Sequence, residues 1–246
     1  MNLTNQVAYA EAPVATRKMA SRLGVWAAVL TTLCTVVFAV IAIPTPARSG
    51  PFCATWGCVP YPYTDVAQFI PGDYLWLVPG ILLAPLFVVL FACIHDFALE
   101  GHKLFSRIAL LFAGAYAVVI LADYFSQFTI VMPSLMSGET AGLSLFTQYN
   151  PHGFFIAGEA LGYLLMSLAF LFAAPVFAAG GAQRALRWLF ALSFVLAVVA
   201  FVDLWLLKND LIAFEVTILM INWVALITAG VLLSIVFRRA VRPGAT

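Results

Sequence analysis

The stretch IALLFAGAYAVVILADYFSQFTIVM, residues 108–132, decides the fold of this protein. Its residues are apolar almost throughout, and the one charged side chain among them is Asp123. A helix needs about 20 apolar residues to cross roughly 30 Å of hydrocarbon, because each residue adds about 1.5 Å and every backbone group must be satisfied within the segment. This stretch therefore predicts a transmembrane helix with a carboxyl group inside it.

Five further stretches are comparably long and apolar, and with the first they predict six transmembrane helices. The six spans are Leu23–Ile43, Tyr74–Ile94, Ile108–Met132, Phe154–Phe177, Trp188–Leu207 and Leu211–Phe237. Only residues 208–210 separate the last two, which predicts a tight helical hairpin. Charged residues make up 9% of the chain and hydrophobic residues 64%, whereas soluble proteins carry about 25% charged residues. The fold class is therefore an all-α, polytopic membrane helical bundle.

The distribution of Lys and Arg predicts the orientation of this bundle. If the spans alternate in direction, ten of the 12 basic residues flank one side of the membrane, and only Arg48 and Lys208 flank the other. The ten are Arg17, Lys18, Arg22, Lys103, Arg107, Arg184, Arg187, Arg238, Arg239 and Arg242. Because short cytoplasmic loops carry the excess of basic residues, both termini are predicted in the cytoplasm, with the protein in the plasma (inner) membrane.

The predicted organisation is a single domain with short tails. Residues 1–16 are polar without periodicity and predict a mobile cytoplasmic tail. Residues 17–242 form one six-helix transmembrane domain with an outer loop at 44–73, and residues 243–246 form a C-terminal tail. Four tryptophans lie near span ends, as expected for an interfacial aromatic belt. They are Trp26, Trp76, Trp188 and Trp205.

Composition and motifs exclude several classes of function. The net charge is +1 and the basic residues form no stripe, which excludes a nucleic-acid partner. No phosphate-binding loop, zinc-protease motif, nucleophile elbow or haem-ligating histidine pair is present, and no cofactor is predicted. The inner segment at 95–103 collects two histidines and two acids, but a solvated loop is the simpler interpretation, because the spacing matches no metal signature. We therefore predict no metal site.

Cys53 and Cys58 lie together in the outer loop and predict a disulfide. The compartment outside the cytoplasm permits oxidation, and Gly57 gives the backbone freedom to bring the two sulfurs together. Two free thiols are the alternative. A metal site is disfavoured because no outer histidine lies nearby in the sequence.

Four acids lie in the outer half of successive spans: Asp123, Glu159, Asp203 and Glu215. A charge in hydrocarbon costs at least about 2.5–3.5 kcal/mol on insertion scales, so it needs a partner or water. No Lys or Arg lies in the hydrophobic part of any span. These carboxyl groups should therefore keep a proton, draw in water or hold a cation.

Other polar side chains lie at the same level and extend the candidate site. Gln127 follows Asp123 by one turn, Tyr163 follows Glu159 by one turn, and Asn222 follows Glu215 by seven residues on the same face. The outer loop before the fourth span adds amides and an imidazole. The candidate ligand-binding or cation-binding residues are Asp123, Gln127, Glu159, Tyr163, His152, Asn150, Asp203, Glu215 and Asn222. Together they predict a polar cavity open to the outside.

Each acid also has a purely structural interpretation. Asp203 and Glu215 lie about 7 Å from the outer turn, where they can reach interfacial water or pair with Lys208. Asp123 and Glu159 can be protonated carboxyls that hydrogen-bond neighbouring helices. Gly158 and Gly162 give the fourth span a small-xxx-small pattern, which is typical of a tight helix contact.

Three functions fit these features. The first is binding or transport of a small cation, an amine or a lipid-like ligand in the outer-half cavity. The second is a structural or accessory subunit that partners another membrane protein. The third is a small membrane enzyme that uses a buried carboxyl as acid or base on a lipid-like substrate, beside aromatic walls. In each case the lipid bilayer is the surrounding partner, and no catalytic residue is assigned.

Overall fold

The structure is a computed structural model, and it describes residues 3–42, 59–178 and 180–241. Within these ranges the regular structure is entirely helical, and six helices are long and apolar enough to cross a membrane. The apolar spans run Met19–Ala42, Gly72–Phe97, Glu100–Ser137, Phe154–Val176, Ala182–Leu207 and Leu211–Val241. The predicted all-α bundle of six transmembrane helices is confirmed. The predicted disulfide of Cys53 and Cys58 and the tail at 243–246 lie outside the described residues.

The six spans are built from longer and shorter helices. The long ones are α1 (Leu3–Ala42), α2 (Leu77–Phe97), α3 (Lys103–Ser126), α6 (Phe154–Ala173), α7 (Ala182–Ala200) and α8 (Leu211–Val241). The short ones are η1 (Thr64–Phe69), η2 (Gly72–Tyr74), η3 (Glu100–His102), η4 (Gln127–Val131), α4 (Met132–Ser137), α5 (Leu143–Phe146), η5 (Ala174–Val176) and η6 (Phe201–Leu207).

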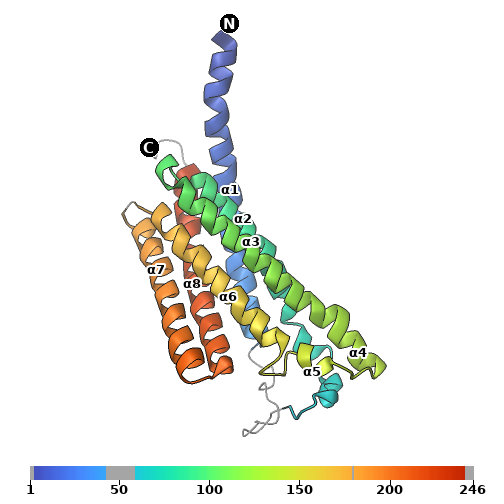
Figure 1. Cartoon of the computed structure of the whole chain (residues 1–246). Coiled ribbons are helices and arrows are strands. Elements are labelled where there is room, and N and C mark those ends of the chain that lie inside the picture. Colours follow the sequence, from blue (N-terminus) through green and yellow to red (C-terminus); the bar gives the residue numbers. More distant parts are fainter. Residues whose placement is uncertain (1–2, 43–58, 179, 242–246) are drawn as a thin grey trace.

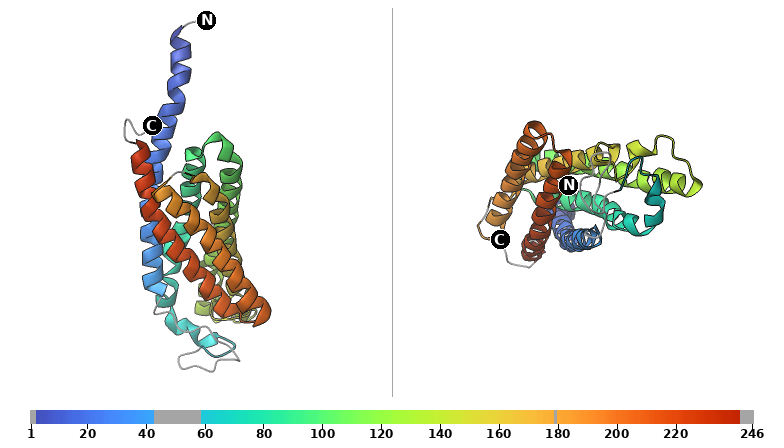
Figure 2. Two further views of the ribbon diagram at one scale, coloured as in Figure 1. Left: turned by 90° about the vertical axis from the view of Figure 1, so that its left-hand side faces the viewer. Right: turned by 90° about the horizontal axis from the view of Figure 1, so that it is seen from below.

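The most extensive contact between helices is that of α3 with α6. The contacts of α1 with α8 and of α1 with α2 come next. Helices α2 and α3 also pack together, as do α7 and α8 (Figure 1). Seen from one end, the bundle is elongated, with α7 at one edge and the α3–α4 rod running toward the other (Figure 2). The α3–α6 contact is therefore central to the site described below.

The first helix is longer than its span. It begins at Leu3, so the segment 1–16, which the sequence predicts as a tail without regular periodicity, is helical from that residue on. Figure 1 shows this part of α1 projecting beyond the other helices at the end where the chain starts.

Two spans contain a π-helical segment near one end. In the third span this is η4, which begins at Gln127. A π turn takes up one residue more than an α turn, so it shifts the phase of the residues that follow it. Gln127, Val131 and Leu135 are all buried at intervals of four residues, so one face of this part of the span is turned toward the core. The second π segment, η6, precedes the α7–α8 hairpin.

The hairpin between the last two spans has the predicted tightness. Asn209 adopts a left-handed backbone conformation with φ of 52°. Asp210 then accepts a hydrogen bond from the backbone N–H of Ala213 over 2.9 Å, which caps the start of α8. Three residues thus suffice to reverse the chain.

Trp76 differs from its predicted interfacial position. Only 2% of it is exposed, because its ring stacks on Phe38 at 5.3 Å and meets the edges of Tyr124 and Phe155 at 5.4 and 5.8 Å. Trp26 and Trp188 do face outward, with 66% and 67% exposed. The aromatic rings around Trp76 join α1, α2, α3 and α6 into one core.

Glycine permits the closest approach of α1 to α8. A Cβ atom at Gly230 would overlap the Thr32 hydroxyl and stand 3.0 Å from the backbone oxygen of Ala28. Thr32 itself is held by a 2.9 Å hydrogen bond to that oxygen. Small residues allow this contact in lipid, where packing rather than water exclusion drives helix association.

We expect Gly230→Ala to lower the apparent melting temperature of the purified protein in detergent, because the new methyl group forces α1 and α8 apart at a cost of about 1–3 kcal/mol. Gly114→Ala is the matched control, since a Cβ atom there meets no atom within 4 Å. Equal melting temperatures for the two variants would contradict the assigned contact.

Candidate functional site

Two of the predicted acids lie on the helices that form the α3–α6 contact. Asp123 is buried on α3, and its carboxyl carbon would lie 3.1 Å from a Cβ atom built on Gly158 of α6. The absence of a side chain at Gly158 is therefore what lets the Asp123 carboxyl approach α6. The next residue of α6 is Glu159, which is fully buried.

Tyr124 links the two helices directly. Its hydroxyl donates a hydrogen bond of 2.5 Å to Oε1 of Glu159. Its ring packs into the space above Gly80 of α2, where a Cβ atom would stand 2.5 Å from the ring. The same ring stacks on Phe155 at 5.8 Å. Consecutive residues of α3 thus bring a carboxyl and a phenol to consecutive residues of α6.

Tyr163 continues this arrangement one turn further along α6. It is fully buried, and its hydroxyl accepts a 3.1 Å hydrogen bond from the indole N–H of Trp223 on α8. Its ring lies 6.2 Å from that of Tyr116 on α3. Asp123, Glu159, Tyr116, Tyr124, Tyr163 and Trp223 are called the acid–tyrosine cluster below.

Asn222 takes part in a separate contact between α6 and α8. Its carboxamide exchanges hydrogen bonds with the hydroxyl of Ser167, at 3.0 and 3.1 Å, and donates to the backbone oxygens of Tyr163 and Ile218. These bonds use both ends of the amide. Asn222 therefore joins two helices, as polar side chains commonly do in membranes.

Gln127 and Glu215 are also in the core, as the sequence predicts for the site, but in different surroundings. The carboxamide of Gln127 donates a 2.8 Å hydrogen bond to the backbone oxygen of Phe146, which ties the π segment to α5. Glu215 is 1% exposed and lies on α8 two turns before Asn222.

Three other predicted residues do not join the cluster. Asp203 forms an ion pair of 2.7 Å with Lys208, and the two side chains are 49% and 58% exposed. The interfacial alternative is therefore the one observed for Asp203. His152 is exposed, and Asn150 donates to the backbone oxygen of Ser144 while it accepts from the backbone of His152. Their positions near span ends let these groups pair locally at the surface.

The loop that carries Asn150 is tied down by its own polar residues. The hydroxyl of Tyr149 donates a 2.8 Å hydrogen bond to Asp73, and Gln148 donates to the backbone oxygen of the same residue. Burial, the neighbouring Tyr74 and the bond to Asp73 together hold the pKa of Tyr149 above its usual value. This loop closes the end of the bundle over the aromatic core.

The acids are enclosed, whereas the sequence predicts a cavity open to the outside. Asp123 and Glu159 are 1% and 0% exposed. Among the described residues, no group of three or more His, Cys, Asp or Glu side chains could hold a metal ion. The geometry suits a proton better than a ligand with many atoms.

The segment at 95–103 has a structural role in this arrangement. His95 shares a 2.8 Å hydrogen bond with Ser106, and the ammonium of Lys103 donates to the backbone oxygens of His95 and Asp96 at 2.7 and 3.3 Å. A basic group at a helix end stabilises the last carbonyls of that helix. These contacts fasten the end of α2 to the start of α3.

Sequence reasoning missed Tyr116, Tyr124 and Trp223 as partners of the acids. Tyr124 is adjacent to Asp123, but neighbouring residues on a helix point about 100° apart, so adjacency predicts no shared site. Tyr116 lies two turns before Asp123, which is a usable signal. Trp223 gives none, because only the packing of α8 on α6 brings it to Tyr163.

We expect Tyr124→Phe to destabilise the protein by about 1–3 kcal/mol, because the variant removes the donor to a buried Glu159 carboxyl and leaves the ring packing intact. The measurement is the apparent melting temperature in detergent. Tyr61→Phe is the control, since 59% of Tyr61 is exposed. If the two variants melt together, the hydrogen bond to Glu159 contributes nothing to stability.

Comparison with known proteins leaves the site to be interpreted from its own contacts. No protein family model matches the chain. No curated protein and no solved structure matches it.

Proposed function

We propose that this protein is a cation-responsive membrane protein, in which Asp123 and Glu159 bind a proton and couple that binding to the packing of α3 against α6. A small cation in place of the proton is compatible with the same groups. In a transport or binding cycle, gain of this proton would strengthen the packing of α3 against α6, and its loss would weaken that packing. The observation that carries the proposal is the approach of the Asp123 carboxyl to Gly158, next to Glu159, inside the apolar core.

Electrostatics supports a bound proton at this position. Each carboxylate costs at least about 2.5–3.5 kcal/mol to hold in hydrocarbon, and both Asp123 and Glu159 are buried. Glu159 accepts a hydrogen bond from the phenol of Tyr124, which is a neutral group. Protonation removes the charge from a buried carboxyl group, so we infer that the site retains at least one proton.

The size of the site supports a proton over an amine or a lipid. Phe155 and Trp76 pack directly against Tyr124, and Ile120 fills the groove at Gly162. A ligand with several heavy atoms would have to displace these side chains. A proton needs no such space.

A structural role is the second candidate, and the Asn222–Ser167 contact favours it. That pair shares hydrogen bonds across α6 and α8 with no titratable group involved. The acid–tyrosine cluster would then serve the same end, holding helices together within an accessory subunit of a membrane complex. The two candidates differ in whether helix packing depends on pH.

The basic residues support a cytoplasmic location for both termini and a place in the plasma membrane. Among the described residues, Lys103, Arg107, Arg184, Arg187, Arg238 and Arg239 all lie at the end where α3 and α7 begin and α8 ends. This end is called the basic end below. The excess of positive charge in short flanks favours the cytoplasmic side for it.

We expect the melting temperature of the wild-type protein in detergent to fall as pH rises, because loss of the proton leaves two negative charges in the core. Asp123→Asn and Glu159→Gln each remove one charge, so their melting temperatures should depend less on pH. Asp203→Asn and Glu139→Gln are the matched controls, since the first carboxyl is half exposed and the second lies in an exposed loop.

The outcome separates the two candidate functions. Asp123→Asn and Glu159→Gln could each shift the melting temperature by the same amount at every pH, so that its dependence on pH stays as in the wild type. That result would refute the proton site and support the structural role. If all four variants reduce the dependence of the melting temperature on pH by the same amount, surface charge and not the core carboxyls explains that dependence.

The proposed orientation has its own test. A green fluorescent protein fused to the C-terminus should fluoresce, because it folds in the cytoplasm, and alkaline phosphatase at the same point should be inactive. Active phosphatase and a dark fluorescent protein would reverse the topology.

A further inference from the structure

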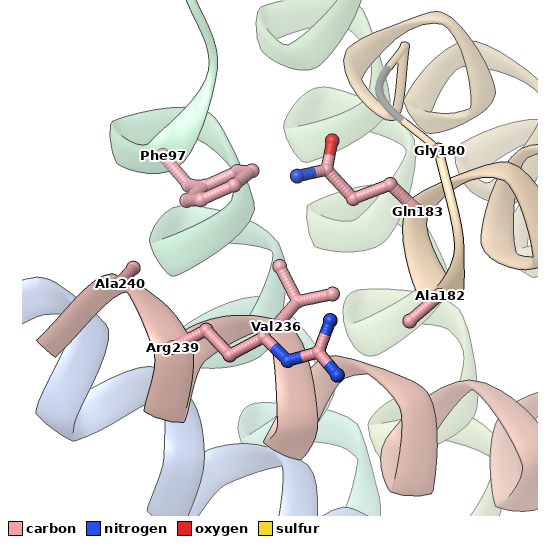
Figure 3. Close-up of a pocket in the computed structure, with 7 residues that line it drawn as sticks. All are labelled: Phe97, Gly180, Ala182, Gln183, Val236, Arg239 and Ala240. Carbon is pink, nitrogen blue, oxygen red and sulfur yellow. The ribbon is translucent and has the colours of Figure 1, made fainter. Parts of the chain in front are cut away.

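A cavity of about 350 Å³ opens at the basic end, between the end of α2, the start of α7 and the end of α8. Figure 3 shows the Gln183 carboxamide and the Arg239 guanidinium extending toward the space between these helices. The lining residues are Phe97, Gly180, Ala182, Gln183, Val236, Arg239 and Ala240. The acid–tyrosine cluster contributes none of them.

The lining of this cavity has two chemical parts. Arg239 presents up to five N–H donors in a planar fork, which suits the oxygens of a phosphate group, and Gln183 presents an amide from the other side of the space. Phe97 and Val236 form an apolar wall. Helix α7 begins at Ala182, so its positive dipole end adds to the attraction for an anion. None of the described residues that line the cavity is acidic.

The position of the cavity selects the source of the phosphate. It lies where α2 and α8 end and α7 begins, at the level at which a bilayer places its headgroups. The flanks of α2, α3, α7 and α8 at this end carry six Lys and Arg residues and two acids, Asp96 and Glu100. Basic pockets between transmembrane helices on this side bind anionic headgroups.

We propose that this cavity binds the headgroup of an anionic phospholipid, with its phosphate on Arg239 and its glycerol and upper acyl carbons against Phe97 and Val236. The volume fits a headgroup of this size, since sites for small molecules start at about 300 Å³. Inorganic phosphate shares the charge but lacks the apolar part, and it binds more weakly. The site stands independently of the proton site in the core.

The test titrates phosphatidylglycerol into the full-length protein in non-ionic detergent and measures bound lipid by native mass spectrometry. Arg239→Gln should weaken binding about tenfold, the loss expected for one charge-assisted contact. Arg238→Gln is the matched control, because it removes an adjacent exposed charge that does not line the cavity. Its loss should be several-fold smaller. Ala182→Phe, which fills the cavity without changing charge, should also abolish the site.

Equal losses in Arg239→Gln and Arg238→Gln would overturn the proposal, because surface charge alone would then explain binding. Unchanged binding in Ala182→Phe would overturn it as well. Phosphatidylcholine and inorganic phosphate form the other two arms. Protein that binds either of them as tightly as phosphatidylglycerol would refute an anionic lipid as the occupant.

Discussion

The hydrogen bond from Tyr124 to Glu159 joins the two helices that share the largest contact in the bundle, and the surrounding structure is arranged around it. In hydrocarbon no water can take the place of a missing partner, so a buried carboxyl must find one within the protein. The ring of Tyr124 also lies over Gly80 of α2 and packs edge-on against Phe38 of α1. One side chain of α3 thus contacts three other spans.

The glycines explain how this contact becomes possible. Gly80 leaves room for the Tyr124 ring, and Gly158 leaves room for the Asp123 carboxyl. In each case the absence of a side chain on a neighbouring helix, α2 or α6, makes room for a polar side chain of α3. Bulk at Gly158 would push the Asp123 carboxyl away from α6, and bulk at Gly80 would displace the Tyr124 ring from α2. The candidate site and the α3–α6 packing use the same residues, which is why we propose that proton binding changes the strength of this packing.

The sequence alone predicts the six spans well, because the need to satisfy backbone groups in lipid leaves only long apolar helices. It also predicts that Asp123 and Glu159 lie deep in their spans, where both are buried, and it offers Lys208 as a partner of Asp203, which is the pair observed. It leaves open whether Glu215 reaches interfacial water, and it places Trp76 at the interface, whereas both side chains are buried. A side chain near a span end can turn either into the core or toward water. For Trp76 the neighbouring helices decide, since Phe38 and Phe155 pack against its ring.

We propose that the Asp123–Glu159 site holds a proton at neutral pH. Infrared spectroscopy of the purified protein distinguishes a protonated carboxyl group from a carboxylate, because the two absorb at different frequencies. If the site holds a proton, the spectrum at neutral pH shows a protonated-carboxyl band that is lost or shifted in Asp123→Asn and in Glu159→Gln, and that Asp203→Asn leaves unchanged. A spectrum in which neither core variant alters that band would show that these carboxyl groups hold no proton at neutral pH.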